Sequence, residues 1–168
     1  MARTSLSDIS GLADPFMLYN FDLVLASAPG GGSNRGLTIQ CMTTALPGWQ
    51  IEQVTSALHG VEVTHAGRQV YSKTFQATFL ETRTMEVRSR LLAWMMVARN
   101  NAANSGSFKS TYAVPATILL YDDIPNVIRT IQVFGVFPTS VDDLSLDGSS
   151  STAANTSVTF SYDYTLES

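Results

Sequence analysis

Charged residues are scarce in this sequence. Asp, Glu, Lys and Arg make up 14 % of its 168 residues, roughly half the share of about 25 % that is usual in globular proteins. A free monomer with so few surface charges is weakly protected against association. The composition therefore favours a subunit that hides much of its surface in an assembly over a neutral soluble monomer.

Basic residues are the scarcest of the charged ones. Ten Lys and Arg stand against fourteen Asp and Glu, so the formal net charge is −4, and no basic run occurs. Proteins that hold nucleic acids through the phosphates need clustered cations. The sequence therefore argues against such a nucleic-acid-binding surface.

Cysteines and long apolar runs are also lacking. The single cysteine, Cys41, excludes an intrachain disulfide and is compatible with a reducing compartment. No stretch approaches the roughly 18 apolar residues of a membrane span. The segment from Met1 to Gly11 is polar and lacks the apolar core of a signal peptide. We therefore expect a protein made and folded in a cytoplasm, with no membrane partner.

Catalytic and metal-binding patterns are missing as well. The two histidines, His59 and His65, lie six residues apart with Glu62 between them. A zinc site there stays open as an alternative, but histidines of a surface or an interface explain the pattern better. No serine lies in a Gly-x-Ser-x-Gly motif, and the glycine-rich loop over 29–34 is not followed by the Gly-Lys-Ser/Thr of a phosphate-binding loop. We expect no enzyme, no cofactor and no metal site.

Strand periodicity is what the sequence does contain, and it is clearest at the C-terminus. From Val158 to Glu167, apolar or aromatic residues alternate with polar ones without a break. A strand places successive side chains on opposite faces, so this pattern predicts one strand with a packed face and a wetted face. The packed face would carry Val158, Phe160, Tyr162, Tyr164 and Leu166.

Similar alternation predicts further strands over 16–27, 37–45, 71–80, 112–121 and 127–137. The second of them is expected to follow the glycine-rich loop directly, with no helix between. The last two read as an antiparallel hairpin.

One segment, about Thr84 to Asn101, reads as a helix. Within it Leu91, Leu92, Met95 and Met96 form the i, i+1, i+4, i+5 stripe of a buried face. We predict that this stripe packs the helix against a sheet or a neighbouring subunit.

The segment from Trp49 to Val70 is a long excursion between two core strands. Both of its halves have strand character, and Ala66-Gly67 is the predicted hairpin tip. Excursions of this kind often carry contacts to partners. The residues predicted to contact another subunit are Trp49, Ile51, Glu52, Val54, His59, Val61, Val63, His65 and Arg68.

Together these elements predict a mainly β fold. Residues 1–15 read as an N-terminal arm and 16–168 as a single domain. Short strands separated by turns favour an antiparallel β-barrel or sandwich, with one flanking α-helix and the long β-hairpin excursion. We expect the arm and the Ser149–Asn155 loop to become ordered only on assembly, because their composition cannot bury enough surface alone.

Several segments, taken in order, resemble a known family. They are the strand Pro15 to Val24, the helix end Leu92-Ala93-Trp94, the hairpin sequences over 117–122 and 131–139, and the closing Thr-Phe-Ser-Tyr-Asp-Tyr over 159–164. This order is similar to that of the tail tube proteins of contractile-tailed bacteriophages. The resemblance extends from about residue 15 to the end of the chain. Tubes of type VI secretion and other contractile injection systems share the fold.

The resemblance implies a β-barrel protomer with a flanking helix, six of which form a ring whose inner sheets join into one barrel. Rings would stack into a tube through which DNA and the tape measure protein pass without specific binding. The implied partners are the tail sheath, baseplate and tail terminator proteins, and the implied location is the virion tail, assembled in the host cytoplasm. Strand faces of uncharged Thr, Gln and Asn suit a lumen wall, because fixed cations would hold the DNA.

Three alternatives stay open. The chain could be the tube of a bacterial injection or secretion system, or a baseplate or terminator protein of the same fold. From a different class, a monomeric β-barrel that binds a small ligand predicts an apolar interior cavity and a monodisperse monomer. The low charge and the apolar helix argue against that third alternative.

Overall fold

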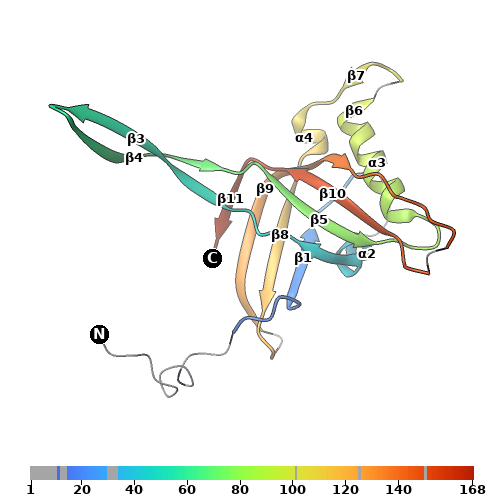
Figure 1. The fold of residues 1–168 in the computed structure, drawn as a ribbon. Coiled ribbons are helices and arrows are strands. Elements are labelled where there is room, and N and C mark those ends of the chain that lie inside the picture. The colour runs from blue at the N-terminus through green and yellow to red at the C-terminus, as the bar shows by residue number, and fades with distance from the viewer. Residues whose placement is uncertain (1–10, 12–14, 30–33, 101, 125, 150) are drawn as a thin grey trace.

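Antiparallel strands dominate the computed structural model (Figure 1), which describes residues 11, 15–29, 34–100, 102–124, 126–149 and 151–168. The predicted arm therefore lies outside the described residues, apart from Gly11 and Pro15. In chain order the elements are β1 (Phe21–Leu25), α2 (Asn34–Gln40), β2 (Cys41–Thr44), β3 (Trp49–Leu58), β4 (Val61–Tyr71), β5 (Thr74–Leu80), α3 (Glu86–Ala98), β6 (Arg99–Asn100), β7 (Ser105–Gly106), α4 (Lys109–Tyr112), β8 (Val114–Tyr121), β9 (Val127–Val141), β10 (Asn155–Ser161) and β11 (Tyr164–Glu167).

Seven strands make up the body, in the order β1-β8-β9-β10-β5-β2, with β11 also paired to β9. The long strand β9 belongs to two layers. Its first half pairs with β8 and β11 in a first layer that includes β1, and its second half pairs with β10 in a second layer that includes β5 and β2. The two ends of the order, β1 and β2, are not paired with each other. The predicted mainly β, antiparallel fold is confirmed in its sandwich form, with an open seam where a barrel would close.

The core fills the space between the two layers. In β5 the predicted alternation is confirmed, since Phe75, Ala77 and Phe79 are all buried. Phe160 of β10 stacks on Phe75 with ring centroids 5.3 Å apart, and Trp94 of α3 packs against the same Phe160 ring at 6.0 Å. These rings fill the interior where a ligand-binding barrel would need a cavity.

The C-terminal stretch is two strands, so the prediction of one unbroken strand was wrong. β10 ends at Ser161 in the second layer, and β11 begins at Tyr164 in the first layer. Because the chain changes layer between β10 and β11, the polar residue of β11 faces inward and its apolar neighbours face outward. Thr165 is buried, whereas Tyr164 and Leu166 are exposed by 42 % and 55 %.

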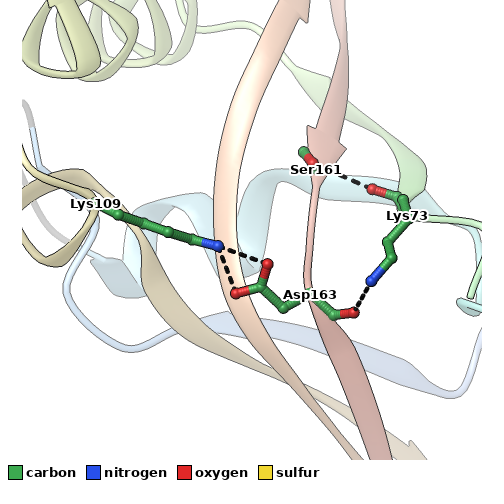
Figure 2. A network of polar contacts seen from close by, with 4 residues as sticks. All are labelled: Lys73, Lys109, Ser161 and Asp163. Atoms are coloured by element: carbon green, nitrogen blue, oxygen red, sulfur yellow. Dashed lines mark hydrogen bonds and ion pairs between the residues drawn. The ribbon is translucent and has the colours of Figure 1, made fainter.

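A polar network fixes this corner (Figure 2). The Asp163 carboxylate accepts hydrogen bonds from Lys109 Nζ at 2.5 and 2.6 Å, and Lys73 Nζ donates to the Asp163 carbonyl at 2.6 Å. Opposite, Gly135 of β9 has φ +71°, and a Cβ there would collide with the Asp163 carboxylate. Past Gly135, Val136 and Pro138 of β9 are buried, and Phe137 is half-buried against the core. β9 continues to Val141, so the predicted end of this strand at Phe137 was wrong.

A second difference lies after the glycine-rich loop, where α2 occupies the first half of the strand predicted over 37–45. Leu37 is buried, and the Asn34 side chain donates to the Ala26 carbonyl at 2.9 Å. These contacts dock a helical turn beside β1, and pairing with β5 begins only at Cys41. The period-two pattern was misleading, because Ile39 points to solvent.

The helix predicted over 84–101 is present as α3, but its buried face is rotated from the predicted stripe. Val87, Arg90, Leu91 and Trp94 are buried, at i, i+3, i+4 and i+7. The sequence pattern did not indicate that Arg90 is buried. Its guanidinium donates a hydrogen bond to Asn34 Oδ1, and burial lowers its pKa. Among the four predicted packing residues, Leu91 is buried, Met95 is half-buried, and Leu92 and Met96 are exposed.

Candidate assembly surfaces

The excursion is a two-stranded hairpin, β3 with β4, that projects from the body (Figure 1). Its tip is His59-Gly60, with φ of 52° and 79°. Two successive positive φ values with glycine second suit the tight turn of a hairpin. The tip predicted at Ala66-Gly67 was therefore wrong. Gly67 instead lies in β4 beside a shift of register, where a Cβ would approach the Glu52 carbonyl oxygen to 2.8 Å.

The outer part of the hairpin has one apolar face. Residues opposite each other in an antiparallel pair share a face. The pairs Val54–His65, Ser56–Val63 and Leu58–Val61 alternate with the pairs Gln53–Ala66, Thr55–Thr64 and Ala57–Glu62. We call the first set the hairpin apolar face. Its four aliphatic side chains are 48–68 % exposed, because in the described part of the chain β3 and β4 pack mainly on each other.

All nine residues predicted for inter-subunit contact are exposed in the protomer. Trp49 and Ile51 lie at the base of the hairpin and His59 at its tip. Glu52 and Arg68 form an ion pair at 2.7 Å, which contributes little stability because both side chains are exposed. Their contact with another subunit stays a prediction.

Both histidines lie on the hairpin, His59 at its tip and His65 in β4. His65 Nε2 is 3.2 Å from Ser56 Oγ on the hairpin apolar face. Over the described ranges, no three His, Cys, Asp or Glu side chains are grouped in a way that could hold a metal ion.

A second apolar surface follows the open seam between β1 and β2. We call it the seam groove, and it is lined by Phe16, Leu18, Phe21, Met42, Thr43, Thr44, Leu46, Ile118 and Leu120. Leu18, Met42 and Leu46 are exposed along it. Sequence reasoning missed the groove, because it placed Phe16 and Met17 inside the first strand and gave the seam no role.

Further apolar side chains are exposed elsewhere on the body. Phe134 stacks on Tyr164 at 4.7 Å on the outer face of the first layer, beside Leu166. Met96 of α3 and Phe108, just before α4, are also exposed. Extended exposed apolar patches mark interaction sites, so these surfaces indicate a protomer that is covered by other protein subunits in an assembly.

Cys41 packs against the core from β2. Burial raises the pKa of its thiol to about 12. A thiol that stays protonated at neutral pH is a poor nucleophile, so Cys41 acts in this fold as a small hydrophobic residue.

The comparisons with known proteins bear on the whole body of the fold. A family model described as phage tail tube protein matches residues 20–167. The chain belongs to this family. Its role as a structural tail tube protein, predicted from the resemblance, is thereby confirmed. The tail tube proteins gp19 of Enterobacteria phages T6 and T4 are 25 % and 26 % identical to it over 133 residues, which cover 77 % of this chain and 81 % of theirs.

Solved structures share the fold at lower identity. The sheath/tube terminator of the extracellular contractile injection system PVC superposes with a TM-score of 0.70 at 17 % identity, covering 94 % of this chain and 99 % of that one. The PVC sheath-tube complex superposes with a TM-score of 0.60 at 17 % identity, covering 99 % of both chains.

Within the described residues, none of the helices is both long enough and apolar enough to cross a membrane.

Proposed function

We propose that this chain is the repeating subunit of a phage tail tube, in which six copies form a ring and stacked rings form the conduit for DNA delivery. The observation that carries the proposal is the projecting hairpin, whose apolar face is left exposed by the described residues of the protomer. An isolated two-stranded hairpin is marginally stable in water. A neighbouring copy would supply the missing cover.

The hairpin apolar face can supply substantial association energy. Fully burying a Val or Leu side chain contributes about 1.5–3 kcal/mol. Scaled by the exposed fractions of Val54, Leu58, Val61 and Val63, covering this face gives roughly 3–7 kcal/mol per hairpin. The hairpin and the seam groove are different surfaces of one chain. A contact between two unlike surfaces can close a ring or extend a stack. The hairpin apolar face and the seam groove are two such surfaces on this chain.

Adjacent residues of β4 give a matched test. Val63 lies on the hairpin apolar face and Thr64 on the opposite face, and both are exposed. We expect Val63→Asp to fold but to lose tube formation, because it would bury a carboxylate in the contact. Thr64→Asp, with the same new charge, should still form tubes. Negative-stain electron microscopy and size-exclusion chromatography read out assembly, and circular dichroism reads out folding.

A coarser variant complements this pair. Deleting residues 52–68 should leave a folded protomer that cannot polymerise. Tubes of normal appearance from the deletion variant, or from Val63→Asp at wild-type protein concentration, would contradict the proposed contact.

The proposed partners follow from the same role. They are further copies of the chain, the tail sheath, baseplate and terminator proteins, and the tape measure protein and DNA inside the channel, with no enzymatic activity. Assembly would take place in the host cytoplasm. The likeness to chains named as a sheath/tube terminator and a sheath-tube complex supports this set. The exposed side of α3, with Leu92 and Met96, is a candidate sheath contact. Loss of sheath co-sedimentation by Met96→Glu tubes would test it.

A terminator role is the second candidate. The PVC sheath/tube terminator superposes better than the PVC sheath-tube complex, with TM-scores of 0.70 and 0.60. Electron microscopy separates the two, because a terminator forms single rings at every concentration whereas a tube subunit forms filaments.

A further inference from the structure

The hairpin of β3 and β4 joins the body through two short connections. The chain enters the hairpin at Gly48, before Trp49, and leaves it at Ser72 and Lys73, before β5 begins at Thr74. We call Gly48, Ser72 and Lys73 the hairpin root. Beyond the root, in the described part of the chain, β3 and β4 pack mainly on each other. The direction in which the hairpin projects therefore depends on what holds its root.

One buried hydroxyl holds both connections. Tyr162, which lies between β10 and β11, is 2 % exposed. Its phenol donates to the Gly48 carbonyl at 3.2 Å and lies 2.8 Å from Ser72 Oγ. The Ser72 N–H also donates to the Gly48 carbonyl, at 3.3 Å, which ties the two connections to each other. A buried hydroxyl without partners is costly, and the two partners that satisfy Tyr162 belong to the hairpin root.

Lys73 ties the same root to the corner between β10 and β11 (Figure 2). Its φ is +64°, in the left-handed region that residues with a side chain rarely adopt. Its carbonyl accepts hydrogen bonds from the Tyr162 N–H at 3.0 Å and from Ser161 Oγ at 3.2 Å. Its ammonium donates to the Asp163 carbonyl at 2.6 Å. A strained residue persists where the surrounding contacts fix it, so these contacts hold the chain in its turn from the hairpin into β5.

Aromatic rings add an apolar contact at the same place. Tyr71, the last residue of β4, packs edge to face against Tyr162 with ring centroids 6.5 Å apart, and Tyr162 packs against Phe75 of the core at 6.0 Å. The root is thus connected to the core through Tyr162. The hairpin apolar face begins farther out, at the pair Val54–His65. The contacts that hold the hairpin and the surface that it presents are therefore separate.

We propose that Tyr162 and Lys73 are positioning residues for assembly, which fix the direction of the hairpin in the free protomer before a neighbouring copy covers it. This inference rests on the proposed function. Ordering a mobile segment on binding costs free energy, and a segment already held in its bound direction avoids that cost. When the competent direction is only partly populated, the apparent dissociation constant rises in inverse proportion to that fraction. Because Tyr162 is buried, it acts through the hairpin and not by contact with the neighbour.

Tyr162→Phe tests the role of the hydroxyl, because it removes that group and keeps the ring. Tyr121→Phe is the matched control, since the Tyr121 hydroxyl donates to Asp22 Oδ2 at 3.0 Å between β8 and β1. Both variants lose a tyrosine hydroxyl and its hydrogen bonding, but only the first loses it at the hairpin root. Lys73→Met, which keeps the aliphatic chain and loses the ammonium, is a second variant at the root.

Electron paramagnetic resonance measures the direction of the hairpin. Spin labels are attached at Thr64→Cys on the hairpin and at Gln132→Cys on β9, both exposed, in a Cys41→Ala background that removes the native thiol. The distance distribution between them is recorded on dilute protomers, so it does not depend on tube formation. We expect a narrow distribution in this parent and in Tyr121→Phe, and a broadened one in Tyr162→Phe and Lys73→Met.

Assembly of the unlabelled proteins is followed by sedimentation over a concentration series. We expect Tyr162→Phe to raise the critical concentration for tubes about tenfold, and Tyr121→Phe to leave it unchanged. Urea denaturation of both variants compares their losses of global stability, so that a general effect of stability can be recognised.

The same width of the distance distribution in Tyr162→Phe and in the parent would overturn the inference. So would a broadened distribution with an unchanged critical concentration, or an equal rise in critical concentration for Tyr121→Phe. Failure of both Tyr162→Phe and Lys73→Met to fold would show that these residues hold the body and not the hairpin, and would overturn it as well. A wild-type chain that forms no tubes would instead refute the proposed function, and the distance distribution would still decide whether the root fixes the hairpin.

Discussion

Replacing Gly135 by alanine tests the corner that joins the two layers. At φ +71° an alanine has left-handed backbone strain, and its Cβ would collide with the Asp163 carboxylate. The backbone term costs roughly 1–2 kcal/mol. The carboxylate must also move away from Lys109, and a half-exposed ion pair contributes up to about 1 kcal/mol. We expect Gly135→Ala to lower the free energy of unfolding by about 1–3 kcal/mol in total.

Urea denaturation of the protomer measures this change. Gly148→Ala is the matched control, because nothing lies within 4 Å of a Cβ there, and it should change stability by less than about 0.5 kcal/mol. In an Asp163→Ala background the steric term disappears, so Gly135→Ala should cost only the backbone strain. A Gly135→Ala protein as stable as the wild type would refute the reasoning, and equal costs in both backgrounds would refute the role of the carboxylate.

Two further predictions follow from the core and from the Cys41 thiol. Phe160→Ala should destabilise the protomer by about 3–5 kcal/mol because Phe160 is fully buried, whereas Phe108→Ala, exposed by 86 %, should leave unfolding unchanged; urea denaturation compares them. The Cys41 thiol has its folded-state pKa raised from 9.0 to about 12, so its contribution to stability is complete below pH 9 and is lost as the pH rises toward 12. Cys41→Ala should show a shallower loss of stability over that interval, and identical pH profiles would contradict burial of the thiol.

Local patterns predicted the parts of the fold that depend on local periodicity. The inward set of β5 and the pairing of β8 with β9 follow from alternation and short turns, and both are confirmed. The reversal of inward-facing and outward-facing residues at Gly135 and Asp163 was not predicted, because it depends on contacts between residues far apart in the sequence. Lys109 and Lys73, which fix Asp163, cannot be linked to it by any local pattern.

The candidate assembly surfaces were predictable to a similar extent. The excursion itself was foreseen, because two strand-like segments between core strands form a hairpin. Its tip was misplaced, since Ala66-Gly67 resembles a turn as much as His59-Gly60 does, and only the register separates them. That error also hid the hairpin apolar face. The seam groove could not be foreseen, because it depends on the failure of β1 and β2 to pair.

Negative-stain electron microscopy of the purified wild-type protein across a concentration series shows directly whether this chain assembles into a tube. We expect rings at low concentration and hollow filaments at high concentration, with six-fold symmetry in end-on views. A protein that stays monomeric at every concentration, and that also fails to extend from baseplates that carry a tube initiator, would contradict it.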